Sequence, residues 1–304
     1  MDLNSSPELL KFIRSTSVAL PFDRDPWAVV AGGLRVERPL VLRYLRDLMA
    51  EGALLGVWGE PNPAIDEGQE VLMEFEEAPP DKAEGAVVRW KARRREGGWL
   101  GSVMALVRSP GAGARARRFL KAGFALTFND DPGALLLPDE DRTRLLTGER
   151  FHLPPMSYEE AVFSDQLFAP VRFNPEEPLW EWIGRGSGFG EEEARLLARR
   201  LVYHQVWRRF ALRYDLGRLG WKGCGLATWE FPEGEGVAQE AAKALAALRG
   251  TADVALREPR EAGGPVRLMA LWVGRGEGDG ESAAREVARQ WSRPLAGFEA
   301  VEVI

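Results

Sequence analysis

The stretch from residue 222 to residue 304 constrains the fold most, because strand and helix signals follow one another there in a single order. Strand segments are rich in aromatic and β-branched residues, helix segments place apolar residues on one face, and turns with glycine or proline separate them. The predicted order is strand, helix, strand, strand, helix, strand, at residues 225–231, 237–248, 253–257, 266–273, 281–291 and 298–303. We therefore expect four antiparallel strands with both helices on one face.

Residues 65–135 show the same pattern with one helix fewer. The predicted strands span 69–75, 86–95, 99–107 and 124–128, and the predicted helix spans 115–122. Both stretches are therefore predicted as ferredoxin-like antiparallel sheets. In each, the face without helices is left for a partner or a ligand.

Two helices and a strand are predicted before each sheet, which is the order of a winged helix-turn-helix. In the first copy, Gly32 and Gly33 are expected to form the turn between the helices, and the strand is expected to begin a local hairpin. The predicted elements are 26–31, 36–49 and 53–58 in the first copy, and 178–183, 191–203 and 206–210 in the second. Because Leu48 aligns with Leu201, and residues 73–75 with 229–231, the chain is predicted to be a tandem duplication.

The expected fold class is α+β, with four consecutive parts. These are a winged helix at 1–64, a degenerate sheet at 65–135, a linker and second winged helix at 136–221, and a complete sheet at 222–304. We expect the two sheets to face each other across a pseudo-twofold axis. Because that pairing is internal, a monomer or weak homodimer is expected.

Composition excludes several classes of protein. One cysteine and two histidines among 304 residues cannot form an internal disulfide or an all-protein Cys/His zinc site, so no metal site is predicted. A net charge of −6 makes nucleic acid an unlikely partner for the whole molecule. The sequence has neither a run of 18 apolar residues nor a secretory signal pattern, so we expect a cytoplasmic protein that does not enter a membrane.

Several segments resemble the sirohaem decarboxylases, which share the AsnC/Lrp-type layout of winged helix and ferredoxin-like sheet. The resemblance lies in Pro26-Trp27, the segment Val-Trp-Arg-Arg-Phe at 206–210, and the segment at 219–232 that ends in Thr-Trp-Glu-Phe-Pro. The resemblance implies a lyase that removes carboxyl groups from the acetate side chains of sirohaem, in haem d1 or alternative haem biosynthesis. It also implies that the iron tetrapyrrole is the substrate and that no further cofactor is required.

The family's motif on the second strand of a sheet is His-x-Tyr-x-Arg. Here the corresponding residues are Asp253, Ala255 and Arg257, so only the arginine is kept. The resemblance therefore implies a catalytic or ligand-binding role for Arg257, while Asp253 is a candidate proton donor if burial raises its pKa. His152, in the linker between the copies, is a second candidate donor. A non-catalytic tetrapyrrole-binding relative is the alternative.

A run of alternating cations lies on the predicted strand 86–95. Arg89, Lys91, Arg93 and Arg95 would share one face of a regular strand. A substrate with several carboxylates requires such cations, and with Arg267 this face is a candidate substrate-binding surface. We expect it to converge with Arg257 on one cleft between the sheets. A solvated face and a nucleic-acid contact are the alternatives.

The layout also permits an AsnC/Lrp-type DNA-binding regulator. The first presumed recognition helix, at 36–51, carries three acidic and three basic residues, which is poor for contacting phosphates. The second, at 191–209, begins with three glutamates. Regulation by DNA binding is therefore the second hypothesis.

Overall fold

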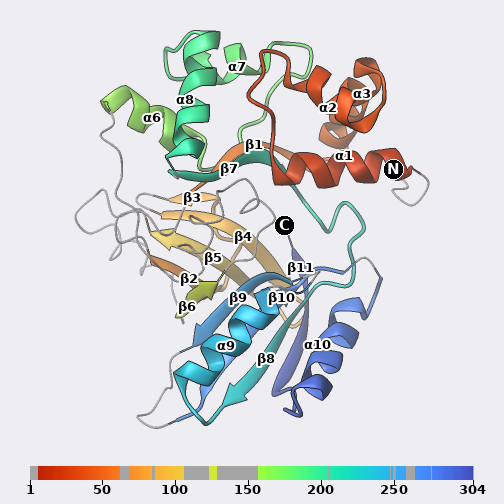
Figure 1. The fold of residues 1–304 in the computed structure, drawn as a ribbon, viewed down its shortest axis with the longest axis vertical. Coiled ribbons are helices and arrows are strands. Elements are labelled where there is room, and N and C mark those ends of the chain that lie inside the picture. The colour runs from red at the N-terminus through yellow and green to blue at the C-terminus, as the bar shows by residue number, and fades with distance from the viewer. Residues whose placement is uncertain are drawn as a thin grey trace. The chain divides into compact units, whose positions relative to one another are not determined.

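A computed structural model describes residues 6–61, 69–83, 86–105, 123–128, 157–204, 206–246, 248, 251–257, 264–274 and 276–303 (Figure 1). The chain divides into two compact units, each built from separated stretches. The helical unit comprises Met1–Asp66, Pro132–Leu136 and Phe151–Leu219, and the sheet unit comprises Glu67–Asp131, Leu137–Arg150 and Gly220–Ile304. The predicted α+β class is confirmed, and the four-part division of the chain stays a prediction.

Two series of helices, each followed by a strand, form the helical unit. The elements are α1 (Pro7–Val18), α2 (Pro26–Leu34), α3 (Arg38–Ala50), β1 (Leu54–Pro61), α6 (Tyr158–Gln166), α7 (Leu179–Arg185), α8 (Glu191–Tyr203) and β7 (Trp207–Tyr214). Polar side chains begin several of them: Ser6 accepts a hydrogen bond from the Leu9 amide, and Ser157 forms a capping box with Glu160. Helices α1 and α6 have no counterpart in the elements predicted from the sequence.

The predicted turn at Gly32-Gly33 is wrong. Helix α2 continues through both glycines to Leu34. The chain reverses at Arg35, whose φ of 59° is left-handed and whose amide donates to the carbonyls of Ala31 and Gly32. The helix therefore ends at Leu34, after the glycine pair that was predicted to form the turn.

Strand β1 pairs with β7 in an antiparallel ribbon, with Val57 opposite Leu212 and Gly59 opposite Phe210. One face of the ribbon is aromatic, and the rings of Trp180 and Phe210 stack with centroids 5.1 Å apart. The returning strand of the predicted local hairpin would fall at residues 62–68, which lie outside the described residues. The strand that β1 pairs with thus comes from the second copy.

The sheet unit contains nine strands and two helices among the described residues. They are β2 (Gln69–Phe75), β3 (Lys82–Ala83), β4 (Ala86–Arg94), β5 (Trp99–Ala105), β6 (Gly123–Phe128), β8 (Gly225–Phe231), α9 (Glu235–Ala246), β9 (Thr251–Arg257), β10 (Val266–Trp272), α10 (Asp279–Gln290) and β11 (Gly297–Val303). From β8 to β11, strands and helices follow the order that the sequence predicts. The predicted helix at 115–122 lies outside the described residues.

The two predicted sheets form one hydrogen-bonded sheet, which corrects the expectation of two separate sheets facing each other. The strand order is β11-β8-β10-β9-β6-β2-β5-β4-β3, and β11 also pairs with β4. The strands from β11 to β4 therefore form a closed circuit. The pairings β6–β9 and β4–β11 join the halves and satisfy backbone groups that two separate sheets would leave at their edges.

Helices α9 and α10 cover one face of the strands β8 to β11, as Figure 1 shows. Trp229, Leu268 and Ala270 from the strands are fully buried there, with Leu245 from α9 and Ala284 from α10. Burial of this apolar surface supplies the main stabilisation of the second half. We call this the outer face and the opposite side of the same strands the inner face.

Candidate functional site

The inner face of the second half carries an ion pair between Arg267 and Glu230. The Arg267 Nε and Nη2 atoms lie 2.8 and 2.7 Å from Glu230 Oε1, and both side chains are 40% exposed. Met269 and Leu271 follow on the same face and are buried. Arg267 thus lies on the sheet face that α9 and α10 leave open.

Strand register places Arg257 and Asp253 at positions of the same face. Arg257 is opposite Arg267, and Asp253 is opposite Leu271. Glu230 is opposite Arg267 on its other side. The register thus brings together three residues that the sequence singled out: Asp253, Arg257 and Arg267.

The cations predicted on β4 do not join them. Arg93 is opposite Glu302 and Arg94 is opposite Val301. Arg94 is ion-paired with Glu299, which is opposite Leu226 on the inner face. Because side chains alternate along a strand, Arg93 and Lys91 lie on the outer face instead. The expected convergence of Lys91 and Arg93 with Arg257 is therefore wrong.

Arg89 and Arg95, the two ends of the predicted row of cations, do not follow the two-residue alternation of side chains along β4. The pairing of β4 with β5 is irregular between Val88 and Trp90, so the two-residue period does not extend back to Arg89. Arg95 lies in the turn after β4, and its exposed guanidinium is 3.4 Å from Glu277. Lys91 is bound to Asp81 at 3.1 Å and to the Pro79 carbonyl at 3.2 Å. Lys91 and Arg95 therefore belong to separate ion pairs.

Sequence reasoning missed Arg94 and Glu299. Arg94 donates through Nε to Glu299 Oε1 at 2.5 Å and through Nη2 to Oε2 at 2.8 Å. The sequence does place Arg94 on a defined face: side chains alternate along a strand, so Arg94 lies on the face of Trp90 and Ala92, opposite to that of Arg93. It could be interpreted only once the pairing partner of β4 was known.

The remaining expectations concern His152, metal binding and membrane spans. His152 lies outside the described residues. Among the residues that the structure describes, no group of three or more His, Cys, Asp or Glu side chains could hold a metal ion. A search of those residues for membrane spans also finds no helix with the length and apolarity required.

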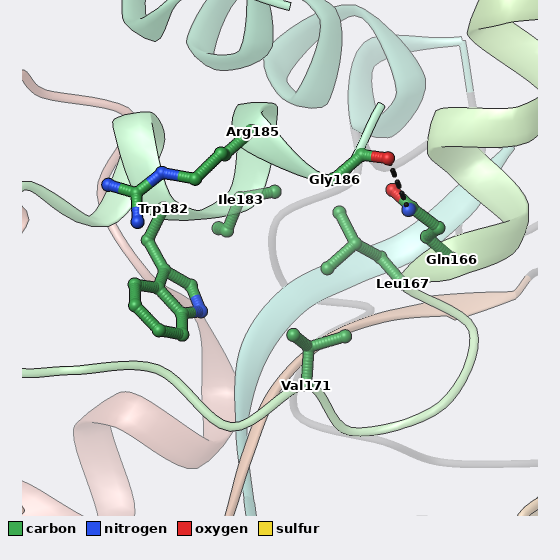
Figure 2. Close-up of a pocket in the computed structure, with 7 residues that line it drawn as sticks. All are labelled: Gln166, Leu167, Val171, Trp182, Ile183, Arg185 and Gly186. Atoms are coloured by element: carbon green, nitrogen blue, oxygen red, sulfur yellow. Dashed lines mark hydrogen bonds between the residues drawn. The ribbon is translucent and has the colours of Figure 1, made fainter. Parts of the chain in front are cut away.

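A pocket of about 340 Å³ lies in the helical unit (Figure 2). Trp182, Ile183, Arg185 and Gly186 come from α7 and its C-terminal end, and Gln166, Leu167 and Val171 come from α6 and the segment after it. Its walls are largely apolar, which is usual for a small-molecule site. The sequence did not indicate this pocket, because its lining combines segments on either side of a loop.

The polar groups of this pocket are already engaged by the protein. Trp182 Nε1 donates to the Arg172 carbonyl at 2.9 Å, and Gln166 Nε2 donates to the Gly186 carbonyl at 3.0 Å. The Arg185 guanidinium is bound by Glu177 and Glu181, which raises its pKa. The hydrogen bond from Asn174, followed by that from Arg185, lowers the pKa of Glu177. The pocket therefore suits a small uncharged molecule better than a ligand with many carboxylates.

Comparison with known proteins gives a likeness of fold. No family model matches the chain, and no curated protein matches it. Solved structures do, among them "Crystal structure of the siroheme decarboxylase NirDL" and the same protein "in co-complex with iron-uroporphyrin III analogue". Their identities are 16% and 15% and their TM-scores 0.53 and 0.54, and each match covers 97% of this chain and 90% of the other. At this identity the likeness shows that the chain shares the fold of sirohaem decarboxylase NirDL.

Proposed function

We propose that this protein binds an iron tetrapyrrole with carboxylate side chains, with sirohaem as the substrate. The observation that carries the proposal is the register of Arg257 opposite Arg267 on the inner face. Arginine forks bind carboxylates in bidentate geometry. Support also comes from the family motif at Arg257 and from a fold likeness that extends over nearly the whole chain.

The proposed reaction is decarboxylation of the acetate side chains, in haem d1 or alternative haem biosynthesis. The bond between the methylene carbon and the carboxylate breaks, carbon dioxide leaves, and the electron pair that stays on carbon takes up a proton. Arg257 and Arg267 would hold neighbouring carboxylates and fix the reacting arm. Asp253 is the proposed proton donor, because it occupies the histidine position of the motif on the same face.

The finer architecture belongs to the same proposal. We propose two winged helix-turn-helix units, each followed by a ferredoxin-like half of the closed sheet. A cytoplasmic location, and a monomer or weak homodimer, remain part of this proposal. Sedimentation as a large ring would contradict the assembly.

An anaerobic titration with sirohaem, followed by mass spectrometry of the tetrapyrrole, tests the function. We expect saturable changes in visible absorbance and loss of the mass of one carbon dioxide per reacted arm. Iron octaethylporphyrin, which has no carboxylates, is the control ligand and should bind more weakly than sirohaem. Binding without loss of mass would identify a non-catalytic relative, and absence of sirohaem binding would overturn the proposal.

The second hypothesis, DNA binding, is less well supported. On α3 the guanidinium groups of Arg38 and Arg46 are ion-paired with Asp25 and Glu176. Helix α8 begins with three glutamates, which repel phosphate at a helix start. A gel shift at low salt with random-sequence duplex DNA should therefore show no complex.

A further inference from the structure

The pair formed by Arg94 and Glu299 lies at the seam where β4 and β11 close the sheet. It is diagonal across the strand pair, because Arg94 is directly opposite Val301, two residues after Glu299. Two parallel hydrogen bonds of 2.5 and 2.8 Å join the guanidinium to the carboxylate. The two side chains are 29% and 27% exposed, so the pair is neither fully solvated nor sealed from water.

Strand register connects this pair to the proposed site. Glu299 is opposite Leu226, Leu226 is opposite Leu271, and Leu271 is opposite Asp253. Residues opposite one another share a face, so Arg94 is on the inner face with Arg257 and Arg267. In the closed circuit, β4 and β9 are four places apart in either direction and therefore stand on opposite sides of it.

We propose that Arg94 binds a carboxylate side chain of the tetrapyrrole, and that Glu299 occupies its guanidinium until the substrate arrives. This inference rests on the proposed function and assigns to the site a residue outside the family motif. The resident carboxylate already has the bidentate geometry that a substrate carboxylate would adopt. Because Glu299 is partly exposed, water can solvate its carboxylate when the substrate displaces it. This keeps the free-energy cost of the exchange small.

Arg93 provides a matched control for Arg94. The two residues are adjacent on one strand and carry the same charge, but they point to opposite faces. We expect Arg94→Ala to weaken sirohaem binding about tenfold or more, as loss of a charge-assisted bidentate contact does, and Arg93→Ala to change it less than about twofold. Equal dissociation constants for the two variants would overturn the inference.

Glu299→Gln separates substrate binding from a structural role. If Glu299 only competes for Arg94, removing its charge should tighten sirohaem binding, whereas Arg94→Ala weakens it. If the pair only holds the seam together, both variants should weaken binding and both should lower the urea midpoint of unfolding; that result would overturn the inference. Failure of the wild-type protein to bind sirohaem would instead overturn the proposed function, so the two failures are distinguishable.

Discussion

The two halves of the closed sheet share a topology but differ in the chemistry of the inner face. Excluding β3, their strand orders are β6-β2-β5-β4 and β11-β8-β10-β9, which in each half is fourth, first, third, second. In the second half, Glu230 is opposite Arg267 and Arg267 is opposite Arg257. At the corresponding positions of the first half, Glu74 is opposite Leu100 and Leu100 is opposite Ala92.

The two halves therefore share a strand order, but the first half has no arginine at the positions of Arg257 and Arg267. Ala92 and Leu100 are 0% and 1% exposed, so they form part of a packed wall. The carboxylate-binding positions proposed at Arg257 and Arg267 are therefore in the second half. Arg94, the last residue of β4, is an arginine that the first half contributes to this face.

The largest expected effect tests whether the second half holds the main core. Trp229 is fully buried between the sheet and the helices, and its ring centroid is 5.7 Å from that of Trp291. Trp229→Ala should lower the free energy of unfolding by about 3–5 kcal/mol, because it removes a large side chain and leaves a cavity. Urea denaturation followed by circular dichroism measures the loss.

Trp90, on the inner face of the first half, is the tryptophan chosen for comparison in that experiment. It is half-buried rather than buried, so Trp90→Ala should cost less than Trp229→Ala. A larger loss at Trp90 would reverse the assignment of the main core to the second half.

A smaller effect, on binding rather than folding, is expected at Arg257. Loss of its guanidinium removes charge-assisted hydrogen bonds worth about 1.5–3 kcal/mol, so Arg257→Ala should weaken sirohaem binding roughly tenfold or more. Absorbance titration measures the dissociation constant. Arg285→Ala, on the exposed surface of α10, removes the same charge and should leave binding unchanged.

Two results would contradict the role of Arg257. The first is binding as tight as in the wild type. The second is an equal loss in Arg285→Ala, which would show that net charge, and not the position on the inner face, controls affinity.

Much of the second half could be predicted from the sequence. The strands and helices between Gly225 and Val303 alternate with distinct turns, so their order follows from local periodicity alone. Arg257 and Arg267 could be placed on paired strands of one hairpin for the same reason. Local signals suffice where neighbouring elements pair with one another.

The closure of the sheet could not be predicted, because it depends on strands far apart in the chain. Val301 is opposite Arg94 across more than half of the sequence. Side chains alternate with a period of two, so Arg93 and Arg94 lie on opposite faces, but which of these is the inner face follows only from the pairing of β4 with β11. This is why the sequence selected Arg93 instead of Arg94.

The pocket in the helical unit was missed for a related reason. Leu167 and Ile183 are apolar residues that the sequence alone cannot distinguish from ordinary core residues. Their arrangement around a cavity arises from the path of the loop between α6 and α7, which an isolated bridge between Val57 and Val171 holds against β1. Loop paths of this kind are set by tertiary contacts.

The smallest effect is expected at Gly225, where the two halves differ in how closely neighbouring side chains approach the backbone. A Cβ atom at Gly225 would lie 2.1 Å from the Phe298 ring, so Gly225→Ala must displace that ring from the outer-face core. Overpacking should cost about 1–2 kcal/mol in the free energy of unfolding. Gly297→Ala on β11 is the control, because no atom lies within 4 Å of its added Cβ.

The position of the first half that corresponds to Gly225 is Gln69, a residue with a long side chain. A loss confined to Gly225→Ala would show that the requirement for glycine arose with the packing of Phe298, whereas equal losses in both variants would attribute the effect to the backbone alone.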